Sequence, residues 1–211
     1  QQKELNALNK KIDDLIAAEI ERARKQAEEE ARKQAEVKKK RANDASGSQS
    51  STKQSPSSKS STSKTTWLTP ADQKLNGTFV QNKGKLPVPI TGQYRISGRF
   101  GQYNVPGLKN VTLDNKGVNY VGKQGARARC IYDGEVTAIF QFSGAKNVLV
   151  RHGSYISVYC NLSSVIVKKG QKLKTRDIIG TVAKDETGNC ILHFQLRKET
   201  TKLNPELWIS K

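Results

Sequence analysis

Apolar residues recur at intervals of three and four along the first 44 residues of the chain, with Lys, Arg, Glu and Gln between them. This spacing places the apolar side chains on one face of a helix. The stripe weakens from Leu and Ile to Ala, so its second half would bury less area per turn. The pattern predicts an amphipathic α-helical coiled-coil segment over residues 1–44, or a helix that only spaces two parts of the chain. Its apolar positions are Leu5, Leu8, Ile12, Leu15 or Ile16, Ile20, Ala23, Ala27, Ala31 and Ala35.

Residues 45–66 consist almost entirely of Ser, Thr, Lys, Gln and Gly. Such a segment has no apolar anchors to offset the entropy of ordering, so we expect a flexible linker. Structure should resume in the segment 67–90, where Thr69 before Pro70 and Asp72 in the first turn predict the start of a short helix. The apolar residues that can pack this segment on the following domain are Trp67, Leu68, Leu75 and Phe79.

From residue 91 to residue 211 the pattern changes to short runs of alternating apolar and polar residues separated by turns. This pattern predicts a mainly β domain, an antiparallel β-sandwich or barrel, in which Asp133 and Gly134 form a tight hairpin. The expected strands cover residues 94–96, 117–121, 127–132, 135–142, 147–151, 156–161, 178–182 and 191–197.

The chain of 211 residues carries a net charge of +18, and residues 67–211 hold most of it, with 22 basic and 9 acidic side chains. A basic surface favours an acidic protein, an anionic lipid or a nucleic acid. Aromatic residues make up only 6% of the chain and no recognisable nucleic-acid motif is present, so we expect no nucleic-acid partner. The chain has no Met and begins within the helical pattern, which favours a fragment whose signal peptide and upstream region were removed.

Three cysteines, Cys130, Cys160 and Cys190, are evenly spaced but fit no C-x-x-C metal-binding pattern. They can serve as small buried apolar residues, or two of them can form a disulfide if their Cα atoms lie within about 7 Å. The spacing alone does not decide between these alternatives.

Three short stretches carry the candidate chemistry: Asn115 to Asn119, Tyr159 to Leu162, and Ile191 to Phe194. They resemble the three signatures of the lysostaphin/LytM-type metallopeptidases, which read H-x-x-x-D, Y-x-H-L and H-x-H-F. Further segments in the same order extend the resemblance over roughly residues 79–211. One of these segments, Val167 to Gly180, would by itself equally fit a biotinyl- or lipoyl-carrier domain, but no Lys lies on a tight hairpin in the expected place.

By this resemblance the zinc ligands would be Asn115, Asn119 and His193, and the two histidines that assist the attacking water would be replaced by Asn161 and Ile191. Zinc selects imidazole, thiolate or carboxylate, and an Asn amide offers only a weak oxygen donor. Ile can neither donate nor accept a proton. The resemblance therefore implies a peptidase fold without bound zinc, without another cofactor and without enzymatic activity.

Side chains alternate across a strand, so the former catalytic positions should converge in one groove whose wall continues through Gln195 and Arg197. His193 can instead be a packing residue, and the three asparagines can be ordinary polar surface. Arg197 can anchor a carboxylate or be solvated, and His152 in a predicted turn is expected to be structural. The candidate partner-binding groove consists of Asn115, Asn119, Tyr159, Asn161, Ile191, His193, Gln195 and Arg197.

The order of helix, linker and degenerate domain resembles the EnvC-like murein hydrolase activators, as does the segment Phe79 to Ile90, which is close to their F-x-x-N-K-G-x-L-P-W-P-V. The resemblance implies a periplasmic protein that activates a peptidoglycan amidase in cell-wall remodelling at division and is linked through its coiled coil to the FtsEX membrane complex. The alternatives are a noncatalytic module that binds peptidoglycan or acts as a scaffold, and an active zinc endopeptidase. The helix or the segment 67–79 is expected to mask the groove until a signal moves it.

Overall fold

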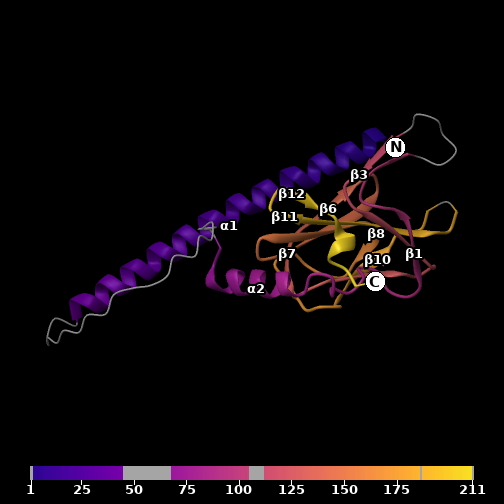
Figure 1. Ribbon diagram of the computed structural model, residues 1–211. Coiled ribbons are helices and arrows are strands. Elements are labelled where there is room, and N and C mark those ends of the chain that lie inside the picture. Colours follow the sequence, from indigo (N-terminus) through magenta and orange to yellow (C-terminus); the bar gives the residue numbers. More distant parts are fainter. Residues whose placement is uncertain (1, 45–67, 105–111, 186, 211) are drawn as a thin grey trace.

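The computed structural model describes residues 2–44, 68–104, 112–185 and 187–210, and it consists of one long helix beside a β domain (Figure 1). Helix α1 (Gln2–Asp44) runs across one face of the sheet and continues beyond the edge of the domain. Helix α2 (Pro70–Gln81) lies on the domain itself. This architecture confirms the predicted fold class, a mainly antiparallel β domain preceded by a long helix. The linker predicted for residues 45–66, together with Trp67, lies outside the described residues.

The main sheet has ten strands, and seven of them follow one another in the order β1-β4-β11-β8-β7-β6-β9. Strand β10 pairs with β5 and β8, strand β12 pairs with β11, and β2 and β3 form a separate two-stranded sheet. Each pairing between named strands is antiparallel. The strands are β1 (Tyr94–Gly98), β2 (Gly101–Asn104), β3 (Thr112–Asn115), β4 (Val118–Gly122), β5 (Arg127–Arg129), β6 (Gly134–Phe142), β7 (Ala145–His152), β8 (Tyr155–Val165), β9 (Lys172–Leu173), β10 (Ile178–Val182), β11 (Cys190–Lys198) and β12 (Thr201–Leu203), and a 3-10 turn, η1 (Pro205–Leu207), follows.

The predicted hairpin at Asp133 and Gly134 is wrong, because β5 pairs with β10 and β6 pairs with β7 and β9. Asp133 instead accepts hydrogen bonds from the backbone N–H and the hydroxyl of Thr175, at 2.8 and 2.9 Å. Gly134 is required for close packing, since a Cβ there would lie 2.4 Å from the carbonyl oxygen of Arg151. The tight turn of this region lies between β6 and β7, where Ser143 and Gly144 both have positive φ.

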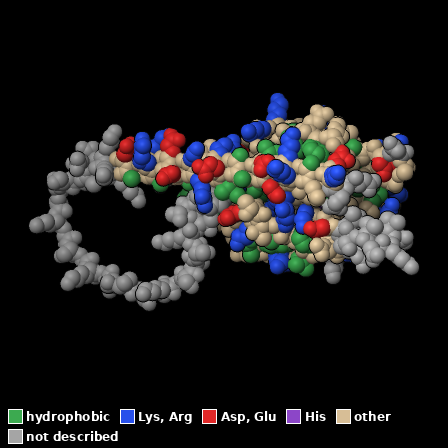
Figure 2. Space-filling view, turned by 90° about the horizontal axis from the view of Figure 1, so that it is seen from above, with side chains coloured by type: hydrophobic (Ala, Val, Ile, Leu, Met, Phe, Trp, Pro, Cys, Tyr) green, Lys and Arg blue, Asp and Glu red, His purple; other side chains and the backbone are tan. Residues whose placement is uncertain are grey.

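Helix α1 covers the outer face of the sheet with the first half of its apolar stripe. Ile12 and Ile16 are fully buried against Leu149, Ile156 and Val158, which makes this contact a second hydrophobic core. Beyond Ala27 the described side chains of α1 are exposed. Figure 2 shows Lys, Arg, Asp and Glu side chains of both signs along the outer side of α1. The helix is therefore confirmed over residues 2–44, whereas the coiled coil stays a prediction.

Helix α2 begins where the sequence predicts. Thr69 is its N-cap, and the Thr69 hydroxyl oxygen accepts a hydrogen bond from the backbone N–H of Asp72 at 3.2 Å. At the other end of the helix, Phe79 is fully buried in the main hydrophobic core. Its ring lies 4.7–5.3 Å, centroid to centroid, from four aromatic neighbours, Tyr132, His152, Tyr155 and Trp208. This cluster fixes α2 to the β domain.

All three cysteines are free and buried, so they act as small apolar residues. Burial raises the pKa of the Cys130 and Cys160 thiols to about 12, which keeps both thiols protonated at neutral pH. Within the described ranges, the structure contains no helix that combines the length and the apolar character needed to span a membrane.

The substitution Phe79→Ala tests the role of the aromatic cluster. Removing a fully buried ring leaves a cavity, and we expect the free energy of unfolding to fall by about 3–5 kcal/mol. Urea denaturation measures the change. The neighbouring substitution Val80→Ala is the control, because Val80 is 44% exposed and should change stability by less than about 0.5 kcal/mol. Equal effects of the two substitutions would contradict this account of α2.

Candidate partner-binding groove

The groove is the face of the sheet formed by β4, β8 and β11 under the first half of α1. Along β11 the side chains of Leu192, Phe194 and Leu196 enter the main core. The intervening residues therefore project from the opposite face, where the register pairs His193 with Asn119 on β4 and with Cys160 on β8. The residues of β11 on this face are Ile191, His193, Gln195 and Arg197.

Two of the three positions that hold zinc ligands in the resembling family are in direct contact. His193 Nδ1 lies 2.6 Å from Asn119 Oδ1. A Cβ placed on Gly98 would lie 2.8 Å from Asn119 Nδ2 and 3.1 Å from Asn115 Nδ2, so the two amides converge on one point of the backbone. Asn115 Oδ1 accepts from the backbone N–H of Gly117 at 3.2 Å, while its buried Nδ2 has no hydrogen-bond partner among the described residues. The structure therefore brings Asn115, Asn119 and His193 together.

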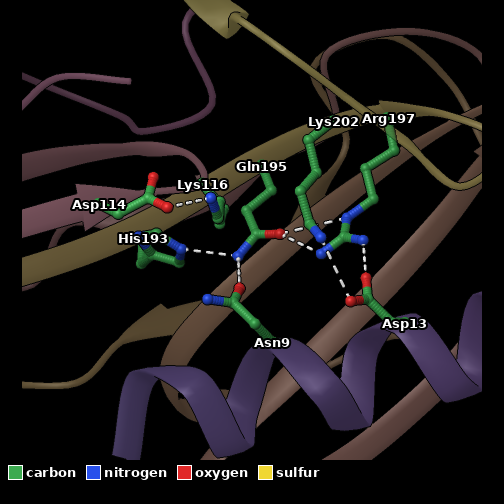
Figure 3. Close-up of polar contacts among 8 residues, drawn as sticks. All are labelled: Asn9, Asp13, Asp114, Lys116, His193, Gln195, Arg197 and Lys202. Carbon is green, nitrogen blue, oxygen red and sulfur yellow. Dashed lines mark hydrogen bonds and ion pairs between the residues drawn. The ribbon is translucent and has the colours of Figure 1, made fainter. Parts of the chain in front are cut away.

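Both ring nitrogens of His193 are engaged by amides, those of Asn119 and Gln195, and Figure 3 shows the contact with Gln195. Because Asn119 Oδ1 is an acceptor, Nδ1 carries the proton and donates, and Nε2 accepts from Gln195 Nε2 at 2.8 Å. Burial, and to a lesser extent the positive charge of Arg197, lowers the pKa of His193 to about 4. The imidazole is neutral at pH 7, which this hydrogen-bond pattern requires.

The hydrogen bonds continue from His193 to the helix that covers the groove. Gln195 Nε2 donates to Asn9 Oδ1 on α1 at 2.9 Å, and Gln195 Oε1 accepts from Arg197 at 2.7 and 3.2 Å. Arg197 in turn donates to the carboxylate of Asp13 on α1 (Figure 3). Asn119, His193, Gln195 and Arg197 thus form one polar relay on the sheet, and α1 supplies its last two partners.

Arg197 is fully buried, contrary to the expectation that it lines an open groove wall. The physical reason is α1, which covers Arg197 and brings the Asp13 carboxylate to it. Lys202 on β12 lies 3.2 Å from the second carboxylate oxygen of Asp13, so one anion of the helix faces two cations of the domain. A buried cation that loses its partner is costly, and this pair therefore ties α1 to the groove.

A second set of ion pairs connects the two helices. Arg151 on β7 lies 3.7 Å from a carboxylate oxygen of Glu19 on α1 and 3.3 Å from one of Asp72 on α2. Glu19 and Arg151 are 8% and 14% exposed, so water screens their interaction only partly. The placement of α1 is thus linked to the start of α2.

Tyr159 does not belong to the groove, and its prediction as a groove residue is wrong. Its side chain is fully buried in the main core, where its hydroxyl accepts from the backbone N–H of Ile131 at 3.1 Å. The alternation of β8 breaks at Asn161, which has a positive φ of 70° beside an irregular pairing with β7. As a result Cys160 and Asn161 both line the groove, and Asn161 Nδ2 donates to the carbonyl of Ile191 at 2.7 Å.

Near the start of α1 the groove keeps a cavity of about 370 Å³. Its floor contains neutral amides and the imidazole of the relay, and its walls come from α1 and from the turn between β6 and β7. Sequence reasoning did not identify this turn, which lies outside the three motifs, or Cys160, which lies within the second motif at a position where the family signature specifies no residue. The lining residues are Glu4, Leu5, Leu8, Asn119, Phe142, Ser143, Ala145, Asn147, Cys160, Asn161, Ile191 and His193.

The residues at the former ligand positions do not fit a zinc ion. Two amides and an imidazole lack the charge and the free nitrogen donors that zinc requires, because Nδ1 of His193 is protonated and Nε2 already accepts a hydrogen bond. Across the part of the chain that the structure describes, His, Cys, Asp and Glu side chains form no group of three that could hold a metal. At these positions Asn119 and His193 are instead joined to one another by a direct hydrogen bond.

Residues 114–205 match the family model described as Peptidase family M23. The match runs from the end of β3 through β12 and includes every residue of the relay on the sheet. With the observed fold, it shows that the β domain of this chain is a LytM-type domain of the M23 family.

The chain is similar to several known proteins and solved structures. It is 28% identical over 126 residues to an uncharacterized metalloprotease of Buchnera aphidicola, and 29% identical over 94 residues to the murein hydrolase activator NlpD of Escherichia coli. These alignments cover 57% and 43% of this chain but only 33% and 25% of the two relatives. Among solved structures, Helicobacter pylori Csd3 is 32% identical with a TM-score of 0.50, over 60% of this chain and 35% of that chain.

The buried histidines should make stability depend on pH. Burial lowers the pKa of His152, like that of His193, to about 4 from an ordinary value of 6.5. Below pH 6.5 the unfolded chain gains protons that the folded chain does not accept until near pH 4, so stability falls as the pH falls through this range. Each histidine should lower the free energy of unfolding by up to about 1.4 kcal/mol for every pH unit within this range. Urea denaturation between pH 7 and pH 5 measures the slope, which His193→Asn should reduce by about half. A flat profile in the parent chain would contradict the assignment.

Restoring the family's ligand types tests the zinc argument directly. We expect no change in the melting temperature of the parent chain on adding zinc. The double substitution Asn115→His and Asn119→Asp supplies an imidazole and a carboxylate beside His193, and zinc at about 1,000 times its dissociation constant should then stabilise the variant by about 4 kcal/mol. Thermal melts with zinc or with a chelator measure both chains. A zinc-dependent melting shift in the parent would overturn the conclusion.

Proposed function

We propose that this chain is a noncatalytic regulator that binds and activates a peptidoglycan amidase through the groove under α1. The observation that carries the proposal is the polar relay from Asn119 to Arg197. Its groups satisfy one another and two side chains of a helix, Asn9 and Asp13, so this surface is organised to hold a protein segment. It offers neither the metal ligands nor the free proton donor that peptide hydrolysis needs.

The similarity to NlpD supports this function, because that protein is called a murein hydrolase activator and is 29% identical to this chain over 94 residues. The same similarity supports a location in the cell envelope, and we place the chain in the periplasm. The relative described as a metalloprotease favours peptidase activity as a second candidate. The amides at the former ligand positions argue against that candidate in this chain.

The structure corresponds to the inactive form in this proposal, since α1 occupies the surface that the amidase would bind. The helix is held by Ile12 and Ile16 on the outer face of the sheet and by the pairing of Asp13 with Arg197. Release of α1 would expose these apolar residues and leave Arg197 unpaired, so a partner must offer comparable contacts to make opening favourable. An acidic, partly apolar element of the amidase meets that requirement.

The second half of α1 is available for a signal. Its described side chains beyond Ala27 are exposed, and ion pairs between residues four apart, such as Glu29 and Lys33, support the helix without the domain. A membrane complex of the FtsEX type that binds this half could pull the first half from the groove. The proposal therefore assigns masking to the first half of α1 and signal reception to the second.

Opening the groove by mutation should activate a purified amidase. The double substitution Ile12→Asp and Ile16→Asp places two charges in an apolar contact and should displace α1. If the closed form dominates in the parent chain, we expect hydrolysis of peptidoglycan by the amidase to rise by at least about tenfold. The full-length chain is used throughout, and dye release from labelled peptidoglycan measures the rate.

Two further variants make this test specific. Ala31→Asp adds a charge to the exposed half of α1 and should leave activation at the parent level. Arg197→Glu in the variant with released α1 should abolish activation, because it reverses the charge of the proposed binding surface.

Two outcomes would assign a different function. If the variant with released α1 binds peptidoglycan but never stimulates the amidase, the chain is a wall-binding module. If that variant hydrolyses peptidoglycan without the amidase, the chain is an enzyme. Either result would refute the proposal.

A further inference from the structure

A second candidate site lies at the free edge of the main sheet, around Tyr94 on β1. Among the described strands β1 pairs only with β4, and Tyr94 lines two hollows of about 390 and 410 Å³. Tyr94 lines both hollows and is 40% exposed, which is unusual for a large apolar side chain in this domain. An exposed aromatic ring between two adjoining hollows suits a ligand made of successive units.

The ring of Tyr94 is held in place by a buried neighbour. It packs edge-on against Tyr120, with ring centroids 5.5 Å apart and an angle of 70° between the planes. Tyr120 is only 2% exposed and belongs to the main core, so it supplies a rigid support. The exposed surface of Tyr94 is therefore a preorganised platform, and a ligand that packs on it loses little side-chain entropy.

The two hollows differ in their polar groups. One contains the ion pair between Arg99 and Glu206 above apolar Ile96 and Ile209. The Arg99 side chain is 71% exposed, so its guanidinium keeps N–H groups free to donate to a ligand. The other hollow has three side-chain amides and two cations, contributed by Gln93, Gln124, Asn189, Arg95 and Lys123.

We propose that these hollows bind an oligosaccharide of N-acylated sugars across Tyr94. A pyranose ring presents a flat face of C–H groups that packs on an aromatic ring, and its hydroxyl and acylamino groups point outward, where they need both donors and acceptors. Side-chain amides provide both, and Arg99 and Glu206 provide one of each. Among the described lining residues of the two hollows, Glu206 is the one carboxylate and Arg95, Arg99 and Lys123 are cations, so neutral or anionic sugars are favoured over cationic ones.

This site is separate from the groove under α1. The residues that line the two hollows differ from those that line the groove cavity, and β1 lies at the edge of the sheet beyond β4. The inference therefore does not depend on the proposed activation of an amidase. A chain with both sites would hold a glycan strand at one edge while its groove opens and closes.

The experiment titrates the full chain with a hexamer of N-acetylglucosamine and follows binding by calorimetry and by the NMR signals of backbone amides. We expect saturable binding, with the largest signal changes at residues 93–96, 123–124 and 206. Tyr94→Ala removes the platform and should weaken binding by at least about tenfold. This loss corresponds to the free energy of stacking on the ring together with that of the apolar surface that the ring buries. Tyr94→Phe keeps the ring and should bind within about threefold of the parent chain.

Two controls separate a binding role from a structural one. Val80→Ala changes an exposed apolar residue on α2 and should leave binding unchanged. Arg99→Gln keeps hydrogen-bonding capacity without the charge, and it should weaken binding less than Arg99→Ala does. The proposal is wrong if the hexamer does not bind, if Tyr94→Ala that melts like the parent binds equally well, or if only a peptide added along the edge of β1 shifts these signals.

Discussion

The buried guanidinium of Arg197 is the constraint on which the arrangement of helix and domain depends. Strand β11 alternates between the main core and the opposite face, so the sequence that places Leu196 in the core places Arg197 on the other side. A buried cation needs an anion and several acceptors. Gln195 supplies two of these hydrogen bonds from the same strand, and Asp13 supplies the anion from a helix 184 residues away in the sequence. The position of α1 on the sheet follows from this requirement and from the packing of Ile12 and Ile16.

The former metal position shows how a LytM-type fold can be stable with amides in place of ligands. A zinc ion joins its ligands by coordination, and here direct hydrogen bonds connect Asn119, His193 and Gln195. The imidazole remains neutral, so no charge has to be compensated at the centre of the groove. Asn115, at one of these positions, keeps a buried amide nitrogen without a hydrogen-bond partner among the described residues. The positive charge of the groove is concentrated instead at its far end, at Arg197 and Lys202.

Much of the fold was predictable because it follows from local patterns. The alternation of apolar residues located the main strands, and Thr69, Pro70 and Asp72 located the start of α2. The prediction for Tyr159 failed because the left-handed conformation of Asn161 shifts the alternation of side chains along β8. Asn tolerates this conformation better than most residues, but an Asn in the sequence does not by itself indicate it. The hairpin predicted at Asp133 does not form, because β5 pairs with the distant strand β10 and not with β6, which follows it in the sequence. The apolar stripe of α1 was visible in the sequence, but its packing on the sheet was not, since a helical stripe fits a sheet and a second helix equally well.

The two arginines that hold α1 differ in what remains when the helix leaves. Arg151 still has Asp72 from α2, so its charge stays compensated within the domain. Arg197 has only Gln195, an uncharged side chain, and Lys202 beside it loses the same carboxylate. Departure of the helix therefore removes the one anion that faces Arg197 and Lys202, and the local charge at this end of the groove rises from +1 to +2. The open domain would attract acidic segments from beyond contact distance and orient them along the groove, with an efficiency that decreases as the ionic strength rises.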